Sequence, residues 1–348
     1  MRVLFVGDLD PNGNAHGHLR ALERVGCEVQ GLDPSPFLAR GGRISGWLRH
    51  RLMMGGAVDA LNDAILEAAS TFKPDMIWGE KPVAIQPKTL RKLCSAGVLL
   101  VSHNVDNPFG DMREPIWRLF RKTIPLYDAH VTPRRSSMLD FPKAGAAQMI
   151  LMELAFDPER QFPPPDGWSD RDRDLAVSFT GSPYDDRAQL VTELLRDHGI
   201  RVDIRGNRWE RMLDQKTYTD LVSGGPVFGD DYRQRIWQSR ICLAFVTHAN
   251  HDETAIRSFE ITACQGLLLS EYTDRLAELF EPDKEAVFFA SAEECAAKIR
   301  WLLDDEEARD RISQAGRVRA VESGYDNTAR FTKMLGELRS RFPGRLPG

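Results

Sequence analysis

The chain has 348 residues, of which 42% are apolar and 28% are charged, and this composition is that of a globular protein large enough for two domains. It has no run of 18 apolar residues, which argues against a membrane span. Its five scattered cysteines lack a Cys-x-x-Cys pair, which argues against structural zinc and for reduced thiols in the cytoplasm. The net charge of −5 divides into +4 for residues 1–150 and −9 for the remainder. This argues against nucleic-acid binding by the whole chain and leaves an anionic partner open for the first half.

The chain opens with a pattern of strand, loop, helix and strand. An apolar run over residues 2–7 ends in glycine, a helical pattern covers residues 15–25, and a second strand is expected over residues 28–32. The first residues lack the long apolar run and the cleavage site of a signal peptide, so we expect a cytoplasmic protein. The loop before the helix lacks the Gly-x-Gly-x-x-Gly pattern, which argues against a dinucleotide-dependent dehydrogenase.

Two stretches of the first half, residues 40–54 and 113–122, mix basic side chains with aromatic and aliphatic ones. One interpretation is a basic amphipathic patch that contacts an anionic membrane surface or a phosphorylated lipid acceptor. The other is that the large apolar members are core residues of the first domain. These members are Trp47, Leu48, Trp117 and Phe120. The sequence alone leaves both interpretations open.

A buried strand in the first half delivers two polar side chains at its carboxyl end. The run over residues 97–102 is mainly apolar, and it is followed by His103, Asp106 and a proline-containing loop. An imidazole or a carboxylate at this place can orient a hydroxyl group of a substrate. The alternative is a histidine that satisfies backbone groups at the end of the strand.

A stiff and charged stretch over residues 157–174, which includes three consecutive prolines, is the predicted domain linker. A strand over residues 175–180 follows and leads through Gly181 and Ser182 into a helix that carries Arg187 near its start. A glycine-containing loop between a strand and a helix presents backbone amides to a phosphate group. The second domain therefore opens with a candidate phosphate site.

The most informative stretch covers residues 241–271. An apolar run, a polar loop, a short helical pattern and a Gln-Gly stop lead into a second apolar strand. Polar side chains thus gather between the carboxyl end of one strand and the amino end of a helix, where open α/β sheets bind their ligands. Within that helix, Arg257 and Glu260 lie on a different face from the apolar residues.

This stretch resembles the donor-site signature of retaining nucleotide-sugar glycosyltransferases of the GT-B fold, in the form found in their CgeB-like, or spore-maturation, branch. The pattern of that branch is Arg-x-Phe-Glu-x-x-Ala-Cys-Gly. The corresponding residues are Arg257, Phe259, Glu260, Ala263, Cys264, Gln265 and Gly266. The two acids that such enzymes place eight positions apart would be Asp252 and Glu260. Gln265 stands where the pattern has glycine, which leaves the shape of the sugar pocket open.

The resemblance implies roles for individual residues. Glu260 would accept hydrogen bonds from the ribose hydroxyls of the nucleotide, which suits a carboxylate because its two oxygens form a fixed fork. Arg187 and Arg257 would neutralise the diphosphate. The remaining donor-site residues would be Phe259, Gly181, Ser182, Val227, Phe228, Gly13 and Asn14. The residues that would serve catalysis are His103, Asp106 and Asp252.

Two of these pairs have a second interpretation. Gly13 and Asn14 would bring backbone amides to a phosphate or an acceptor, but a tight turn followed by surface histidines explains them equally well. Val227 and Phe228 would form an apolar shelf for the base, whereas a buried edge strand is the alternative.

The fold implied by the resemblance is GT-B, an α/β fold in which two Rossmann-like domains face each other across a cleft. We expect an N-terminal acceptor-side domain over residues 1–156 and the linker at 157–174. A nucleotide-sugar domain is expected over residues 175–324. A C-terminal helix over residues 325–348 would return to the N-terminal domain.

The implied activity is the transfer of a sugar, of the hexosyltransferase type, from a nucleotide diphosphate sugar such as a UDP- or GDP-sugar. Retention of configuration, and catalysis without a metal or other cofactor, are implied with it. The acceptor stays open among a glycan, a lipid-linked molecule, a protein and a small molecule, and so does a peripheral position at the inner face of the membrane. A nucleotide-sugar epimerase on the same fold and a non-catalytic nucleotide-binding scaffold are the alternatives.

Overall fold

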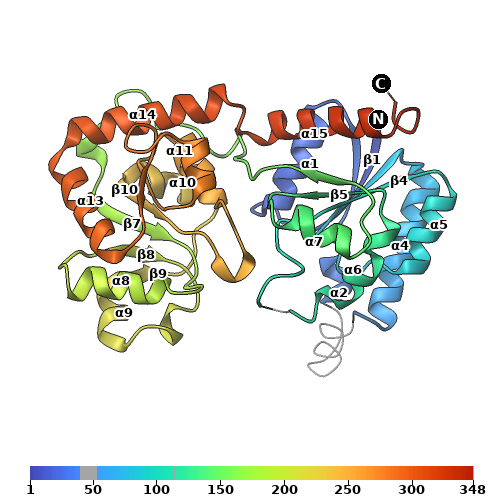
Figure 1. Ribbon diagram of the computed structural model, residues 1–348, viewed down its shortest axis with the longest axis horizontal. Coiled ribbons are helices and arrows are strands. Elements are labelled where there is room, and N and C mark those ends of the chain that lie inside the picture. Colours follow the sequence, from blue (N-terminus) through green and yellow to red (C-terminus); the bar gives the residue numbers. More distant parts are fainter. Residues whose placement is uncertain (40–52, 113, 348) are drawn as a thin grey trace. The chain divides into compact units, whose positions relative to one another are not determined.

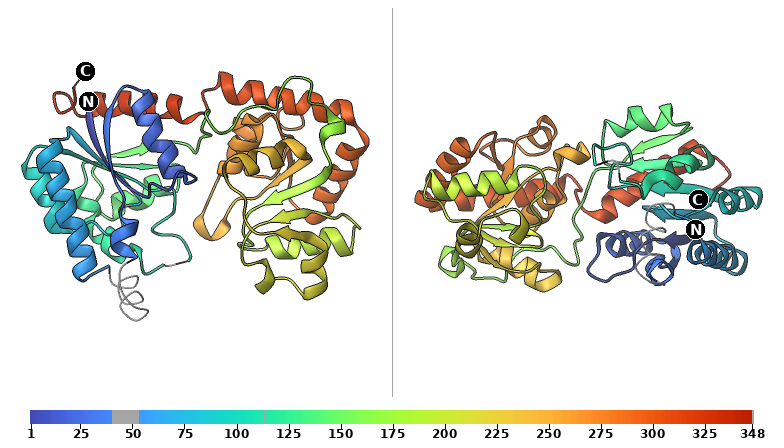
Figure 2. Two further views of the ribbon diagram at one scale, coloured as in Figure 1. Left: turned by 180° about the vertical axis from the view of Figure 1, so that it is seen from behind. Right: turned by 90° about the horizontal axis from the view of Figure 1, so that it is seen from below.

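The computed structural model describes residues 1–39, 53–112 and 114–347 and divides the chain into two compact units (Figure 1). Unit 1 comprises Met1–Glu153 and Asn327–Gly348, and unit 2 comprises Leu154–Asp326. Each unit contains a six-stranded parallel sheet with helices on both faces, as the further views in Figure 2 show. In the described part of the chain, none of the helices has the length and apolar character that crossing a bilayer requires.

The sheet of unit 1 has the order β2-β1-β3-β4-β5-β6. Its strands are β1 (Arg2–Val6), β2 (Glu28–Leu32), β3 (Met76–Glu80), β4 (Leu99–His103), β5 (Ala129–Thr132) and β6 (Met149–Leu151). Its helices are α1 (Asn14–Arg24), α2 (Ser35–Leu38), α4 (Gly56–Phe72), α5 (Pro87–Ser95), α6 (Trp117–Thr123), the 3-10 turn η1 (Ile124–Leu126), α7 (Ser137–Lys143) and α15 (Asn327–Arg341). Successive side chains of β1 pack on opposite faces. Val3 and Phe5 lie against α1 and α15, and Leu4 and Val6 lie against α4 and α5.

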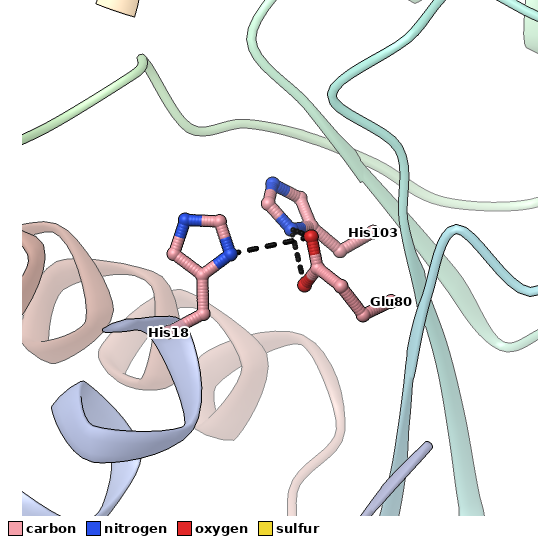
Figure 3. A group of neighbouring side chains, drawn as sticks. All are labelled: His18, Glu80 and His103. Atoms are coloured by element: carbon pink, nitrogen blue, oxygen red, sulfur yellow. Dashed lines mark hydrogen bonds and ion pairs between the residues drawn. The ribbon is translucent and has the colours of Figure 1, made fainter. Parts of the chain in front are cut away.

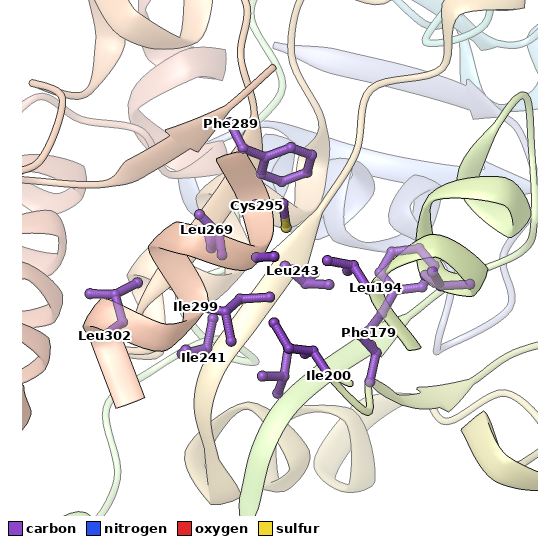
Figure 4. Packing of buried hydrophobic residues seen from close by; sticks show 14 of the residues in the cluster. Phe179, Leu194, Ile200, Ile241, Leu243, Leu269, Phe289, Cys295, Ile299 and Leu302 are labelled. Atoms are coloured by element: carbon purple, nitrogen blue, oxygen red, sulfur yellow. The ribbon is translucent and has the colours of Figure 1, made fainter. Parts of the chain in front are cut away.

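The sheet of unit 2 has the order β12-β11-β10-β7-β8-β9. Its strands are β7 (Leu175–Thr180), β8 (Asp203–Arg205), β9 (Val222–Gly224), β10 (Ser239–Ala244), β11 (Leu268–Glu271) and β12 (Val287–Phe289). Its helices and 3-10 turns are η2 (Asp170–Asp172), α8 (Arg187–Arg196), η3 (Trp209–Arg211), α9 (Gln215–Leu221), α10 (Gly229–Gln238), η4 (His248–Asn250), α11 (Ile256–Ala263), α12 (Asp274–Leu279), α13 (Ala292–Asp304) and α14 (Glu306–Glu322). Ile241 and Leu243 of β10 pack with α8 and α13 on one face (Figure 4), and the alternate residues Cys242 and Ala244 pack with α10 and α11 on the other.

The strand order reverses once in each sheet, between β1 and β3 in unit 1 and between β7 and β10 in unit 2. Connections leave in opposite directions at such a switch point, so the carboxyl ends of the two strands border a crevice in which open α/β sheets bind ligands. Ligand-binding residues are therefore expected after β1 and β3 in unit 1, with the end of the adjacent β4 beside them, and after β7 and β10 in unit 2.

The two segments at the domain boundaries are placed by buried contacts. In α15, Phe331 and Leu338 are fully buried with the residues of α1, so this C-terminal helix belongs to unit 1. The segment 157–174, expected as a linker, lies within unit 2. The indole of Trp168 donates to the Trp237 carbonyl (3.2 Å), and Asp170 forms an ion pair with Arg309 (2.8 Å).

The two basic-aromatic stretches are only partly described. Residues 40–52 and Arg113 lie outside the described residues, and with them Trp47 and Leu48. In the second stretch, Trp117 and Phe120 are buried in the core of unit 1. For these two side chains the interpretation as core residues is confirmed, because a side chain without exposed surface cannot contact a lipid.

Candidate active site

At the switch point of unit 2, the turn after β7 has room for glycine alone. The N–H of Gly181 donates to the Arg205 carbonyl (2.9 Å), and the Gly181 carbonyl accepts from Trp209 Nε1 (2.8 Å). A Cβ atom at Gly206 would lie 1.9 Å from the Gly181 oxygen, and a Cβ atom at Gly181 would lie 2.7 Å from the Phe179 ring. The backbone segments that follow β7 and β8 therefore approach each other closely, which only residues without a Cβ atom allow.

Arg187, the first residue of α8, uses its guanidinium group to join this turn to the end of β10. Nη1 donates to the Ser182 carbonyl (3.1 Å), and Nη2 donates to the Val246 carbonyl (2.9 Å) and to Thr247 Oγ1 (3.0 Å). The side chain is buried. Burial, and after it the neighbouring charge of Arg257, lowers the pKa of Arg187 to about 10.

Arg257, the second residue of α11, has no hydrogen bond or ion pair with any residue that the structure describes. Its Nε is buried without a partner, and its guanidinium carbon lies 6.0 Å from the centroid of the Phe179 ring. Its Nη2 would lie 3.3 Å from a Cβ atom placed on Gly181. Two guanidinium groups thus lie beside the turn after β7. Arg187 donates to oxygens of the protein, whereas Arg257 has no hydrogen-bond or ion-pair partner among the described residues.

Glu260 lies one helical turn after Arg257 and is half-buried. Its Oε2 accepts a hydrogen bond from the Tyr232 hydroxyl (3.0 Å). Burial raises the pKa of Glu260, and the charge of Arg257 and the bond from Tyr232 oppose this effect only in part. The adjacent Phe259 points into the apolar core, where its ring centroid lies 5.6 Å from that of Tyr325. The Phe259 side chain is fully buried, so it supports α11 and offers no surface to a ligand.

The loop after β10 is held from both sides by carboxylates. Asp185 accepts from the backbone N–H groups of His248 (2.9 Å) and Ala249 (3.2 Å). Glu271, the last residue of β11, accepts from the backbone N–H of Val246 (3.2 Å) and pairs with His248 Nε2. The loop is therefore held in a defined conformation next to Arg187.

The remaining sequence-predicted residues of unit 2 are partly exposed. Asp252 accepts a hydrogen bond from Asn250 Nδ2 (2.9 Å), and its backbone N–H donates to the Thr247 carbonyl (3.1 Å). Val227 and Phe228 lie in the segment between β9 and α10, and Phe228 is 58% exposed. The interpretation of this pair as a buried edge strand is therefore wrong for Phe228.

At the switch point of unit 1, three side chains from three elements meet (Figure 3). Glu80 and His103 end the neighbouring strands β3 and β4 and face each other in register. His103 Nδ1 lies 3.0 Å from Glu80 Oε1 and 2.9 Å from Oε2. His18 Nδ1, from α1, lies 3.2 Å from Oε1, and Trp78 Nε1 donates to Oε2 (2.9 Å). His18, Glu80 and His103, named the His-Glu-His cluster below, are all buried.

The cluster shifts the titration of two of its members. Burial alone raises the pKa of Glu80, but the facing groups His103 and His18 outweigh it and hold that pKa well below its usual range. Burial lowers the pKa of His103, and the Glu80 carboxylate opposes this only in part. The directions describe an ionised carboxylate beside a neutral imidazole near pH 7.

The His-Glu-His cluster also has the donor types of a transition-metal site. Each of its three side chains offers one possible ligand atom, and these atoms lie within 4.8 Å of one another. Two imidazole nitrogens and one carboxylate would suit a divalent transition metal. In this structure the carboxylate oxygens already face the protein's own donors, among them the Trp78 indole.

The other sequence-predicted residues of unit 1 lie near the same edge of the sheet. Asp106 forms an ion pair with Lys81 and has no hydrogen bond with His103 among the described residues. Gly13 occupies the N-cap position of α1, and its N–H donates to the Asp10 carbonyl (2.8 Å) in the turn before the helix. Asn14 begins that helix with an exposed side chain.

Sequence reasoning did not single out several residues of these two edges as site residues. They are His18, Glu80, Asp185, Tyr232, His248 and Glu271. A signal existed for Glu80 and Glu271, because each comes shortly after an apolar run and ends a strand in the structure, where parallel sheets place ligand-binding groups. No such pattern marks Tyr232, which reaches Glu260 from another helix.

Comparison with known proteins adds to this geometry. A family model described as glycosyl transferase-like matches residues 187–336. The structure is similar to sucrose-phosphate synthase from Thermosynechococcus elongatus, with a TM-score of 0.71, 11% identity, and 98% of this chain and 99% of that chain covered. It is also similar to HepE from Anabaena in complex with UDP and glucose, with a TM-score of 0.67, 14% identity, and 98% and 100% covered.

The chain has the GT-B fold. This confirms the α/β fold class that the sequence resemblance implies, with one parallel sheet in each of the two units. A glycosyltransferase from Rickettsia africae shares the fold with a TM-score of 0.61, 13% identity and 99% of both chains covered. No curated protein sequence matches the chain. The family match and these neighbours together support a glycosyltransferase of the GT-B type.

Proposed function

We propose that this protein is a retaining glycosyltransferase that moves a hexosyl group from a nucleotide diphosphate sugar to a hydroxyl group of an acceptor. The observation that carries the proposal is Arg257, a cation without a partner among the described residues, beside the turn after β7. A diphosphate would supply the missing anion, and the charge that develops on it during transfer is what a fixed guanidinium stabilises.

The surroundings of Arg257 suit a diphosphate in two further ways. Gly181 brings bare backbone to the same place, and α8 begins six residues later with its N–H groups unsatisfied by the helix itself. Arg187 adds a second positive charge whose pKa is lowered to about 10, mainly by burial. Two guanidinium groups provide the positive charge that metal ions provide in other nucleotide enzymes, so we propose that no metal is needed.

Glu260 is the proposed ligand of the ribose. It lies on the same helix as Arg257 and one turn away, so a nucleotide whose diphosphate meets Arg257 brings its ribose within reach of Glu260. The carboxylate keeps lone pairs for a diol besides the one that Tyr232 occupies. Phe228, exposed before α10, is the proposed apolar contact for the base.

Structural neighbours lend support to the donor class and to retention. HepE from Anabaena has been solved with UDP and with UDP-glucose. Trehalose-6-phosphate synthase, whose structure addresses glycosyl transfer with retention, resembles this chain with a TM-score of 0.64 and 13% identity. We therefore propose a UDP-sugar as the first donor to test. The CgeB-like branch is also proposed, and its support is the sequence resemblance over residues 257–266.

The acceptor-side expectations remain proposals. His103 and the neighbouring Asp106 stay our candidates for orienting the acceptor or the sugar, and Asp252 is the candidate that faces the sugar in unit 2. A cytoplasmic location, with a peripheral contact to an anionic membrane, stays a prediction whose basic residues at 40–52 lie outside the described residues.

Isothermal titration calorimetry with UDP, GDP, ADP and thymidine diphosphate tests the donor site. At least one nucleotide should bind, and Arg257→Gln should weaken it. A hydrogen bond to a charged group contributes about 1.5–3 kcal/mol, which corresponds to about 10- to 150-fold in affinity. Arg211→Gln is the matched control, because the Arg211 side chain is 75% exposed in the same unit. Equal affinities for both variants would remove Arg257 from the site.

Mass spectrometry of products then separates transfer from the alternatives. The wild type is incubated with the matching nucleotide sugar and a panel of glycan, lipid and small-molecule acceptors. A product heavier than its acceptor by one sugar supports the glycosyltransferase. An epimer of the donor has the same mass as the donor, so the recovered nucleotide sugar is also examined by proton NMR. Conversion of the donor to its epimer without transfer would identify an epimerase, and binding without any product would identify a scaffold.

A further inference from the structure

The carboxylate of Glu260 is held by one hydrogen bond from the neighbouring helix. The hydroxyl group of Tyr232, on α10, donates to Glu260 Oε2 over 3.0 Å. Oε1 has no hydrogen-bond partner among the residues that the structure describes, and it is not a buried atom. A carboxylate oxygen has two lone pairs, so Oε1 keeps both of them for donors that come from outside the protein. The two oxygens of this side chain therefore have different surroundings.

Tyr232 is the donor of this hydrogen bond at neutral pH. Burial, followed by the charge of Glu260, raises the pKa of the Tyr232 hydroxyl well above its ordinary value of 10, so the hydroxyl keeps its proton. Burial also raises the pKa of Glu260, and the charge of Arg257 and the bond from Tyr232 oppose that increase. A donated hydrogen bond favours the ionised form of the carboxylate that accepts it. Tyr232 thus favours the form of Glu260 that can accept further hydrogen bonds from a diol.

The other groups that act on Glu260 do so through charge or not at all. Arg257 lies on the same helix, and Arg160, in the segment before η2, has a weaker effect of the same sign. The Cys264 thiol lies one turn further along α11, and burial raises its pKa, so it stays neutral at pH 7. Within the described chain, Tyr232 is the residue that donates a hydrogen bond to this carboxylate.

The helix that carries Tyr232 is fixed by bonds of its other side chains. Arg235 Nη2 donates to the carbonyl oxygen of Asp203, the first residue of β8 (2.8 Å). Trp237 Nε1 donates to the carbonyl oxygen of Phe162 (3.0 Å). These bonds hold α10 against the sheet on one side and against the segment before β7 on the other. The Tyr232 hydroxyl therefore reaches α11 from an anchored position.

We propose that Tyr232 is a positioning residue of the donor site, which holds the Glu260 carboxylate with Oε1 open to the ribose diol. The ribose as the ligand rests on the proposed function, whereas the hydrogen-bonded carboxylate does not. In this role Tyr232 does not touch the nucleotide and acts through Glu260 in two ways. It keeps the side chain in one orientation, which lowers the cost of ordering it on binding. It also favours the ionised carboxylate, whose oxygens can only accept.

The first measurement is a carbon-13 NMR titration of the glutamate carboxyl groups in the full chain without nucleotide. The Glu260 signal is assigned by its absence from Glu260→Gln. In Tyr232→Phe its midpoint should rise by about 1 pH unit, because the hydrogen bond that favours the charged form is lost. Equal midpoints for the wild type and Tyr232→Phe would overturn the proposal.

Tyr218→Phe is the matched control for this titration. Tyr218 is a partly buried tyrosine of the same unit, and its hydroxyl has no hydrogen bond with the described residues. The variant therefore removes a phenolic hydroxyl group without touching the donor site. It should leave the Glu260 midpoint at the wild-type value.

The second measurement is calorimetry with UDP at several pH values. At about pH 8, Tyr232→Phe should weaken binding less than Glu260→Gln does, because the carboxylate is still present and ionised. As the pH falls, the ratio of the wild-type affinity to that of Tyr232→Phe should grow by up to about tenfold, since the carboxylate of the variant is protonated first. The ionisation of UDP is the same in every titration and cancels in this ratio. A purely structural role of Tyr232 would give one ratio at every pH, and that result would overturn the proposal.

If Tyr232→Phe does not fold, the wild type supplies the test. The ring carbon that bears the Tyr232 hydroxyl should shift in the carbon-13 spectrum with the midpoint of Glu260. A Tyr232 signal that does not follow this midpoint would overturn the proposal.

Failure of the proposed function has a different signature, because the NMR titrations contain no nucleotide. A wild type that binds no nucleoside diphosphate would contradict the donor site itself. Intact UDP binding together with equal NMR midpoints would remove Tyr232 alone.

Discussion

Arg187 and Arg257 carry the same charge at one edge of the sheet of unit 2 but make different contacts. The hydrogen bonds of the Arg187 guanidinium group go to oxygens of the protein, and they join the turn after β7 to the end of β10. Arg257 lies against the Phe179 ring without a partner in the described chain. The first residue therefore builds the site, and the second is available to a ligand.

At the residue scale, Glu260→Gln should weaken nucleotide binding roughly tenfold or more, because one anionic acceptor of about 1.5–3 kcal/mol is lost to the ribose. The fold should survive, since Gln keeps an oxygen for the Tyr232 hydroxyl. Calorimetry with UDP measures the change. Tyr232→Phe is the comparison, since it removes the hydrogen bond within the protein and keeps the carboxylate. A nucleotide affinity that falls more in Tyr232→Phe than in Glu260→Gln would contradict the ribose contact.

Gly206 gives a second prediction at this scale. Gly206→Ala forces a Cβ atom to within 1.9 Å of the Gly181 carbonyl oxygen, a backbone atom that cannot turn aside. Overpacking of this kind costs about 1–3 kcal/mol of unfolding free energy. Gly225→Ala is the control, because a Cβ atom there meets nothing within 4 Å. Urea denaturation that ranks the two variants equally would show that the turn after β7 is free to move.

At the scale of elements, sequence patterns predicted most strands of the two sheets and missed short ones. The apolar runs predicted strands at 2–7 and 241–246, and the structure has β1 at Arg2–Val6 and β10 at Ser239–Ala244. The strand β9, Val222–Gly224, was missed because its three residues Val-Ser-Gly have neither an apolar run nor a β-branched pattern. The strand forms through its pairing with β8, a contact that the local sequence does not reveal.

The segment 157–174 shows a limit of composition. Its prolines and charges are typical of a solvated linker. Asp170 is nevertheless buried, with Arg309 as its partner 139 residues later in the sequence. A pairing over that separation leaves no local pattern, so the structural role of this segment could not be predicted from the stretch itself.

The helix α15 carries a stability prediction. Phe331→Ala should lower the unfolding free energy of unit 1 by about 3–5 kcal/mol, because the ring is fully buried between His18 and Trp78. Lys333→Ala, exposed on the same helix, should change it by no more than about 0.5 kcal/mol. Denaturant titration of both variants provides the measurement. Equal stabilities would show that α15 is not part of the core of unit 1.

Glu80 and His103, which end β3 and β4, should make the folded state of unit 1 less stable in acid. The pKa of Glu80 is held below its ordinary value of 4.5, so its stabilising effect is complete above that value and is lost as the pH falls below it. The pKa of His103 is lowered from 6.5, so protonation below that pH also favours unfolding. Both signs agree.

Glu80→Gln should remove the part of this dependence that lies below about pH 4.5, because Gln binds no proton. Unfolding free energies of unit 1 are compared between about pH 5.5 and about pH 3 for the wild type, Glu80→Gln and the exposed control Glu67→Gln. A Glu80→Gln variant with the same slope as the wild type would contradict the ionised, paired state of Glu80.

At the scale of the whole molecule, the two sheets were predictable as a class and the two sites only in part. The resemblance over residues 252–266 placed Arg257 and Glu260 on one helix. The structure adds that Glu260 accepts from Tyr232, whereas Arg257 has no hydrogen-bond or ion-pair partner within the residues that the structure describes. The His-Glu-His cluster joins positions 18, 80 and 103, which no motif connects. Such a cluster exists only once the sheet has brought β3 and β4 side by side.

The measurement that tests the central claim most directly is hydrogen exchange, followed by mass spectrometry, of the full chain with and without saturating UDP. Slower exchange is expected in the turn over residues 181–187 and in the loop and helix over residues 246–260. The central claim, a nucleotide site at the carboxyl ends of β7 and β10, would be contradicted if UDP and the other nucleoside diphosphates slowed exchange only in unit 1 or nowhere.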